Sequence, residues 1–330
     1  MKRAILQGPR DFRVEEVSDP KAGPNDIVIQ VKAIGLCGSE LPLFEKGLPS
    51  ERVEEQGLEA VSMAMLGHEW SGEVVEVGAN VTDAKVGDRV LQGGYGGFLE
   101  YYVTRRRPIR IPEEMSFEVG ATIEPTGVAV KAVMKSDPKP GDTVAVIGAG
   151  LIGQTAWQIY RERGASKVFV SELTEKRCET ARAMGADVVI NAAKQDPVKE
   201  ILEATSGEGV DIAAIFADST DAWRVAFEVV RGGAVWHVNR MNKPVTQQDG
   251  GKVVMVTSDP PLGWESLIMR KELTVRGSWG GTGKEALDLV LAGKVNTKDL
   301  ITHEFPLGDI KEAYEMQLKR NESVKVLVKP

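Results

Sequence analysis

A strand, a glycine-rich turn and a helix in succession constrain this chain more than any other feature of its sequence. The apolar run T-V-A-V-I at residues 143–147 is of the kind that is buried on both faces of a parallel sheet. It leads directly into G-A-G-L-I-G at residues 148–153, which opens a helix. Gly148 allows a tight turn, Gly150 lets the backbone approach a pyrophosphate, and Gly153 lets the helix pack close to the sheet.

The same pattern predicts a binding site for the cofactor NAD. Leu151 and Ile152 begin the helix, whose free N–H groups and dipole favour a pyrophosphate at this end. Glu172 ends the next strand, close to the ~20-residue spacing expected for the acid that binds the adenosine ribose. A carboxylate there accepts both ribose hydroxyls and repels a 2′-phosphate, so NAD is favoured over NADP. Arg177 either flanks this ribose or is an ordinary surface arginine of the following helix.

Two regions of the chain differ in the succession of strands and helices that their sequences predict. Up to about Ile123, short strands interrupted by glycine and proline predict a compact β-rich domain. From about Lys139, strands alternate with helices, which predicts a doubly wound parallel sheet. Its fifth strand is either G-G-A-V-W-H-V from Gly232 or G-G-K-V-V-M-V from Gly250, and the local pattern does not decide between them. The expected fold class is α/β with two domains.

Composition excludes several classes of partner. The chain has 330 residues, about two ordinary domains, and a net charge of −7. An acidic surface repels phosphate, which argues against nucleic acid and anionic membrane as partners. The sequence contains no run approaching the ~18 apolar residues of a membrane span. Two cysteines do not support a disulfide framework, so we expect an enzyme of the reducing cytoplasm.

A thiol, an imidazole and two carboxylates stand near glycines in the N-terminal part of the chain. Cys37 lies in G-L-C-G-S-E, His68 and Glu69 lie in L-G-H-E-W-S-G, and Glu124 lies in I-E-P-T-G-V. Three such ligands with an open fourth position are typical of a catalytic zinc. Each residue also has an ordinary structural interpretation, as a core thiol, a hydrogen-bonded histidine or a helix-capping acid. Spacing alone does not decide between these interpretations.

Taken together, the motifs resemble those of the zinc-containing medium-chain alcohol dehydrogenase family. The resemblance is carried by the G-x-C-G-S turn at Cys37, by the tripeptide Gly67-His68-Glu69 and by the glycine-rich loop. It covers nearly the whole chain. Within the family, C-G-S-E and the dipeptide Glu124-Pro125 are most similar to the polyol (sorbitol) and threonine dehydrogenase branch.

The resemblance implies a definite domain organisation. Residues 1–126 and 279–330 are expected to form a GroES-like catalytic domain from both ends of the chain. Residues 127–278 are expected to form the Rossmann domain that binds NAD. Family members associate through the edge of the cofactor-domain sheet, so a homo-oligomer, dimer or tetramer, is expected through residues 273–276.

The resemblance also implies roles for single residues. Cys37 and His68 are expected to bind one catalytic zinc, with Glu69 and Glu124 as alternative further ligands, directly or through water. Ser39 is expected to pass the substrate proton, and Glu69 is assigned to the catalytic set. The implied activity is NAD-dependent oxidation of a secondary alcohol such as a polyol, cyclitol, sugar alcohol or amino alcohol. The alternatives are a zinc-free NAD(P)H-dependent reductase on the same fold and a non-catalytic NAD-binding protein.

Three features depart from the family pattern. The only cysteines are Cys37 and Cys178, so the four-cysteine lobe and its structural zinc are expected to be absent. Leu41 stands where relatives often have histidine, which leaves the proton route beyond Ser39 open. The segment from Asn239 to Gly251 resembles an insertion or rearrangement near the expected nicotinamide position.

Overall fold

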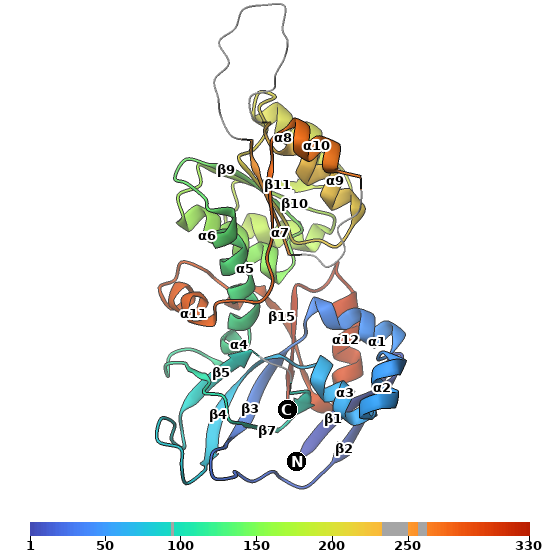
Figure 1. The fold of residues 1–330 in the computed structure, drawn as a ribbon, viewed down its shortest axis with the longest axis vertical. Helices are drawn as coiled ribbons and strands as arrows, with labels where there is room; N and C mark the ends of the chain where they lie inside the picture. The colour runs from blue at the N-terminus through green and yellow to red at the C-terminus, as the bar shows by residue number, and fades with distance from the viewer. Residues whose placement is uncertain (94–95, 233–249, 257–262) are drawn as a thin grey trace, which may run out of the picture. The chain divides into compact units, whose positions relative to one another are not determined.

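The fold consists of two compact units, each with its own sheet and hydrophobic core (Figure 1). The first, called here the β-rich unit, combines Met1–Pro125 with Gly283–Pro330, and the second, called the parallel-sheet unit, is Thr126–Thr282. The computed structural model describes residues 1–93, 96–232, 250–256 and 263–330. The expected insertion at 239–251 lies outside these residues except for its last two glycines.

The β-rich unit is built on a seven-stranded sheet of order β15-β16-β3-β4-β5-β8, with β7 also paired to β3. The strands are β3 (Ile27–Gly35), β4 (Glu69–Val77), β5 (Arg89–Gly93), β7 (Tyr101–Thr104), β8 (Ile109–Arg110), β15 (Ile301–Pro306) and β16 (Lys325–Lys329). A smaller sheet contains β1 (Lys2–Gly8), β2 (Asp11–Glu16) and β6 (Phe98–Leu99). Helices of this unit are α1 (Leu41–Lys46), α2 (Ser50–Gln56), α3 (Leu58–Met65), α4 (Phe117–Gly120), α11 (Gly283–Leu291) and α12 (Ile310–Leu318).

Strand β3 explains why both ends of the chain meet in one unit. Its alternation of apolar residues with Gln30 and Lys32 gives a buried face and a half-buried face. It pairs with β4 on one side and with the C-terminal strand β16 on the other, where Leu327 is opposite Gly35. The backbone N–H of Leu36 then donates to the carbonyl of Val326 at 3.0 Å. The turn that follows β3 is therefore held against the last strand of the chain.

The parallel-sheet unit confirms the predicted doubly wound fold. Among its described residues, six parallel strands have the order β11-β10-β9-β12-β13-β14. They are β9 (Thr143–Ile147), β10 (Lys167–Glu172), β11 (Val188–Asn191), β12 (Ile212–Ile215), β13 (Lys252–Met255) and β14 (Thr274–Gly277). The helices are α6 (Leu151–Glu162), α7 (Glu175–Ala183), α8 (Pro197–Ala204), α9 (Thr220–Val229) and α10 (Glu265–Arg270), while α5 (Ile123–Ser136) carries the chain into this unit.

The strand order has its topological switch point at β9. Strands β10 and β11 are added on one side of β9, whereas β12, β13 and β14 are added on its other side. In open α/β sheets, ligands bind beyond the carboxyl ends of the strands at such a switch point. The glycine-rich loop leaves β9 at that end.

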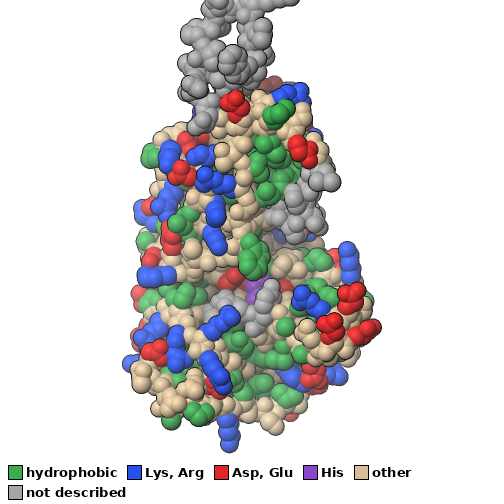
Figure 2. Space-filling model, in the orientation of Figure 1, with side chains coloured by type: hydrophobic (Ala, Val, Ile, Leu, Met, Phe, Trp, Pro, Cys, Tyr) green, Lys and Arg blue, Asp and Glu red, His purple; other side chains and the backbone are tan. Residues whose placement is uncertain are grey.

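Basic and acidic side chains occur together on both described units in the face shown in Figure 2. Among the described residues, the helices are too short or too polar to cross a membrane.

Candidate functional site

The glycine-rich loop has the geometry that its sequence predicts. Gly148 has φ of +94°, a conformation that residues with side chains rarely adopt. A Cβ on Gly153 would lie 1.9 Å from the carbonyl oxygen of Gly148, so the first turn of α6 packs directly on the loop. A Cβ on Gly150 would instead project toward open space, with the Arg177 guanidinium as its nearest neighbour at 3.8 Å. Leu151 then begins α6, and the open backbone at its N-terminus fits a pyrophosphate.

Glu172 is held beside this loop by hydrogen bonds to backbone amides. Its Oε2 accepts from Ala149 N at 2.8 Å, and its Oε1 accepts from Leu173 N at 2.8 Å and Thr174 N at 3.0 Å. The Arg177 guanidinium lies 4.0 Å from Oε2. Oε1 also accepts from Thr174 Oγ1 at 3.3 Å, so it is Oε2 that retains acceptor capacity for a ribose hydroxyl. The remaining loop residue, Ile152, lies half-buried in the first turn of α6.

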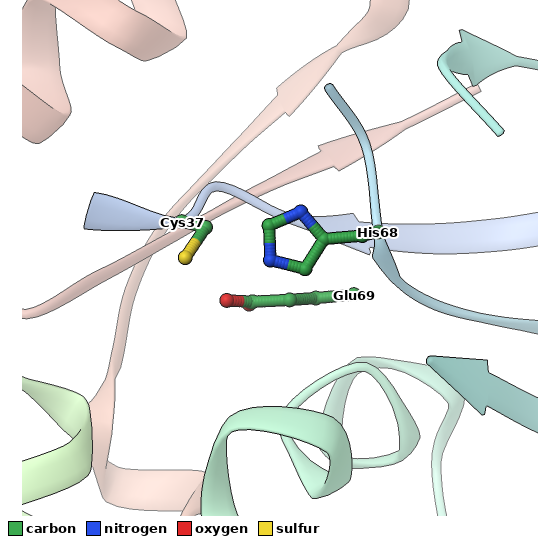
Figure 3. Close-up of side chains that lie close together, drawn as sticks. All are labelled: Cys37, His68 and Glu69. Carbon is green, nitrogen blue, oxygen red and sulfur yellow. The ribbon is translucent and has the colours of Figure 1, made fainter. Parts of the chain in front are cut away.

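The second cluster lies in the β-rich unit, where antiparallel pairing joins two distant turns. Cys37 follows the end of β3, His68 directly precedes β4, and Glu69 begins β4 opposite Gly35. The sulfur, a ring nitrogen and a carboxylate oxygen of these residues all lie within 4.8 Å of one another. Figure 3 shows the three side chains directed toward the same space. A thiol, an imidazole and a carboxylate at this separation form a donor set that fits zinc.

A buried carboxylate orients the histidine of this cluster. Glu40 is fully buried, and its Oε1 lies 2.9 Å from His68 Nδ1 and accepts from Gly67 N at 2.9 Å. Metal-binding histidines ordinarily direct the second ring nitrogen at such a carboxylate. This contact leaves Nε2 of His68 for a metal ion.

The electrostatics of the cluster favour protons on its ligands when no cation is bound. Burial and the negative charge of Glu69 raise the pKa of the Cys37 thiol. Burial alone would lower the pKa of His68, but hydrogen bonds with Cys37 and Glu40 outweigh it and raise this pKa to about 12. Because a metal binds the thiolate and the neutral imidazole, loading of the site releases protons and depends on pH.

Two carboxylates compete for the remaining ligand position. Glu69 is buried and contacts the ammonium group of Lys325, which also donates to Leu36 O at 2.8 Å. Glu124, in the first turn of α5, lies outside the three-residue group. Burial and the negative charge of Glu69 raise the pKa of Glu124 to about 7. Both carboxylates remain candidate ligands.

The predicted proton carrier lies on the same turn as the thiol. The exposed hydroxyl of Ser39 donates to the sulfur of Cys37 at 3.1 Å. Leu41, two residues further, is buried in the core of the unit.

Sequence reasoning missed two residues of this cluster, Glu40 and Lys325. Glu40 closes the quoted motif C-G-S-E, so its position three residues after Cys37 was an available signal. Lys325 is a lysine inside the otherwise apolar closing strand V-K-V-L-V, a pattern that points to a buried ion pair.

Comparisons with known proteins agree with this geometry. A family model described as zinc-binding dehydrogenase matches residues 152–292, and the alcohol dehydrogenase GroES-like domain matches residues 23–113. The chain is 33% identical over 369 residues to (R,R)-butanediol dehydrogenase of Bacillus subtilis, covering 100% of both chains. It is 29% identical to sorbitol dehydrogenase of the same organism, covering 100% of this chain and 97% of the relative.

Comparison of structures gives the same result over the whole length. The crystal structure of 2R,3R-butanediol dehydrogenase from Bacillus subtilis superposes with a TM-score of 0.81 at 30% identity, covering 100% of this chain and 99% of that one. With a glycine-rich loop on a parallel sheet and a Cys-His-Glu cluster on the β-rich unit, the chain belongs to the zinc-type medium-chain alcohol dehydrogenase family.

Proposed function

We propose that the protein catalyses the reversible oxidation of a secondary alcohol to a ketone, with NAD as hydride acceptor and one zinc ion. The observation that carries the proposal is the convergence of Cys37, His68 and Glu69, whose ligand atoms lie within 4.8 Å of one another. This convergence adds a Lewis-acid site to a chain whose other unit carries a dinucleotide loop.

Cys37 and His68 are the proposed constant ligands of the zinc, with Glu69 or Glu124 as the third. Bound zinc supplies Lewis acidity toward the substrate oxygen, which lowers the pKa of the hydroxyl group. Glu40 orients the His68 ring by its contact with Nδ1 at 2.9 Å. Lys325 neutralises the buried Glu69 carboxylate and so limits the negative charge of the site.

Oxidation of an alcohol removes one hydride and one proton. NAD accepts the hydride from the carbon that carries the hydroxyl group. We assign the proton to Ser39, whose hydroxyl is exposed and lies 3.1 Å from the Cys37 sulfur. Because Leu41 offers no titratable group, the proton passes from Ser39 to solvent in this proposal.

NAD is the proposed cofactor rather than NADP. The Glu172 carboxylate is fixed at the loop by Ala149 N, in a position where it would accept ribose hydroxyls and repel a 2′-phosphate. Arg177 is proposed as a neighbour of the same ribose, because its guanidinium lies next to both Gly150 and Glu172.

A single zinc per chain is proposed, without a structural zinc. Structural zinc sites of this kind use four closely spaced ligands, and the chain has only the two cysteines Cys37 and Cys178. The same scarcity of cysteine supports the cytoplasm as the compartment.

The proposed substrate is a small polyhydroxylated alcohol. One relative is named for a vicinal diol and another for a sugar alcohol, and both substrates carry a secondary hydroxyl group beside a second one. Cyclitols share this pattern, and amino alcohols carry an amino group in place of the second hydroxyl; both classes belong to the same proposal.

A homo-oligomer, dimer or tetramer, is proposed through the edge of the parallel sheet. Strand β14 is the last strand of its sheet and is largely exposed, which leaves backbone groups for a second copy. Trp279, two residues after β14, is 90% exposed, as an interface residue would be in the isolated chain. Light scattering of the purified protein tests this point.

The test of the proposed function is a screen of diols, polyols, cyclitols and amino alcohols with NAD and with NADP, monitored at the NADH absorbance. We expect zinc-dependent turnover of at least one secondary alcohol, lost in Cys37→Ser while NAD binding is kept. Metal-independent reduction of activated double bonds would favour the zinc-free reductase. NAD binding without turnover of any compound in either direction would favour a non-catalytic NAD-binding protein.

A further inference from the structure

The two oxygens of the buried Glu40 carboxylate serve two different turns of the proposed zinc site. Oε1 accepts from Gly67 N and contacts His68 Nδ1, both at 2.9 Å. Oε2 accepts from Cys37 N at the longer distance of 3.3 Å. The Glu40 carboxylate therefore links the turn that holds Cys37 to the turn that holds His68, and its orientation determines the position of both turns.

A tyrosine from the other end of the sequence makes the shorter contact to Oε2. The hydroxyl of Tyr314, on α12, donates to Glu40 Oε2 at 2.8 Å, and the side chain is fully buried. Burial and the charge of Glu40 raise the pKa of Tyr314 well above its ordinary value, so the phenol stays a donor. Its ring stacks on Phe44, with centroids 4.8 Å apart, and packs on Phe12 at 5.2 Å.

We propose that Tyr314 is a positioning residue of the metal site, which fixes the Glu40 carboxylate and thereby aligns Cys37 and His68. The inference rests on the proposed zinc site. Without the Tyr314 hydroxyl, the 3.3 Å contact with Cys37 N is the only hydrogen bond to Oε2 from the part of the chain that the structure describes. A fully buried carboxylate whose oxygen has only one long hydrogen bond rotates toward other donors. The turns of Cys37 and His68 then lose the carboxylate that both of them bind.

The packing of the ring allows a clean substitution. Tyr314→Phe removes the hydroxyl and keeps the aromatic contacts with Phe44 and Phe12, so the fold is expected to persist. Tyr160→Phe is the matched control, because Tyr160 is also fully buried and its hydroxyl bonds to Ser136 Oγ at 2.9 Å in the parallel-sheet unit.

The experiment measures zinc affinity by competition with a chromophoric chelator, together with the visible spectrum of the cobalt-substituted protein. Residues that support metal ligands typically affect affinity 10–100-fold, so we expect about 10-fold weaker zinc binding and an altered cobalt spectrum in Tyr314→Phe. Tyr160→Phe should bind zinc like the wild type. In a Glu40→Gln background, Tyr314→Phe should add less than about 2-fold, because both changes act through one carboxylate.

The results distinguish a failure of the proposed role of Tyr314 from a failure of the proposed zinc site. Wild-type zinc affinity in Tyr314→Phe, or an undiminished effect of Tyr314→Phe in the Glu40→Gln background, would overturn the role of Tyr314. An equal loss of zinc affinity in Tyr160→Phe would show a general response to lost buried hydroxyls and would also overturn it. A wild-type protein that binds no zinc would contradict the proposed function itself, and this inference with it.

Discussion

Lys325→Met removes the cation that accompanies the buried Glu69 carboxylate. The ammonium group contacts this carboxylate and donates to Leu36 O at 2.8 Å, and the two charged side chains are 3% and 2% exposed. Methionine fills a similar volume without charge. In the metal-free protein, the substitution therefore leaves a buried carboxylate without its partner and a carbonyl without its donor.

The structure supports an estimate of the cost. Removal of one partner of a buried ion pair destabilises a protein by about 3–5 kcal/mol. Lys329, four residues along the same strand, pairs with Glu118 and Glu304 but is 42% exposed. Exposed pairs contribute about 0–1 kcal/mol, so Lys329→Met serves as the matched control. The two lysine variants should differ by at least about 2 kcal/mol in free energy of unfolding.

Urea unfolding of chelator-treated protein measures this difference. Added zinc should stabilise Lys325→Met more than the wild type, because a cation at the site compensates the charge of Glu69. The double variant Lys325→Met/Glu69→Gln should recover part of the loss, since it removes the uncompensated charge. If chelator-treated Lys325→Met unfolds at the same urea concentration as Lys329→Met, the buried ion pair is not the stabilising contact described here.

Three further predictions concern other parts of the chain. Glu172→Ala should weaken NAD binding and reduce the preference over NADP, measured as dissociation constants for both; an unchanged ratio would contradict the role of this carboxylate. Gly153→Ala should lower stability by about 1–3 kcal/mol and weaken NAD binding, because the new Cβ would meet the Gly148 carbonyl; wild-type unfolding would refute this packing. Asp88 is buried, which by itself raises its pKa, but bonds from Lys85 N and Arg110 lower that pKa overall. The ionised Asp88 carboxylate therefore stabilises the fold above the unfolded pKa of about 3.9. This stabilisation is lost as the pH falls through the lower pKa of Asp88 in the folded protein. Asp88→Asn should thus be less stable than the wild type at pH ~7 and converge on it in acid, and a constant difference in urea unfolding would contradict the shift.

The cofactor-binding sheet was largely predictable because its signals are local. The apolar run before Gly148 and the spacing to Glu172 are read within single segments, and the structure places both beside the same loop. The fifth strand of the sheet could not be identified from the local sequence alone, because two similar runs begin at Gly232 and Gly250. The run at Gly250 contains β13, whose Lys252–Met255 pairs with Ile212–Ile215, whereas the run at Gly232 lies mostly outside the described residues. Only pairing across the sheet distinguishes two such similar sequences.

The segment between the turns of Cys37 and His68 contains helices α2 and α3. The sequence S-E-R-V-E-E-Q of α2 lacks the apolar stripe from which a helix is ordinarily predicted, and none of its residues is buried. Helix α3 buries Val61 and Ser62, and Ser62 Oγ accepts from the backbone of Leu6 at 3.0 Å. Helix α3 therefore depends on its contact with β1, another part of the chain.

The metal cluster shows the limit of sequence reasoning most clearly. Cys37 and Glu69 come together through the register of β3 against β4, which spacing along the chain does not reveal. The resemblance to a family supplied those candidate ligands, but not the charges around them. Glu40 and Lys325 each leave a sequence signal, but their partners become known only in the structure. Tyr314 is recognised only through its hydrogen bond to Glu40, because the sequence does not show which buried polar groups satisfy one another.

The zinc content of the purified protein tests the central claim most directly. The wild type is expected to carry one tightly bound zinc per chain, and Cys37→Ser to lose it. Cys178→Ser is the matched control, because this second cysteine is buried in the parallel-sheet unit and belongs to no metal-ligand group among the described residues. It should retain the zinc. A wild-type protein without zinc, or Cys37→Ser with the full complement, would contradict the convergence of Cys37 and His68 on a single metal ion.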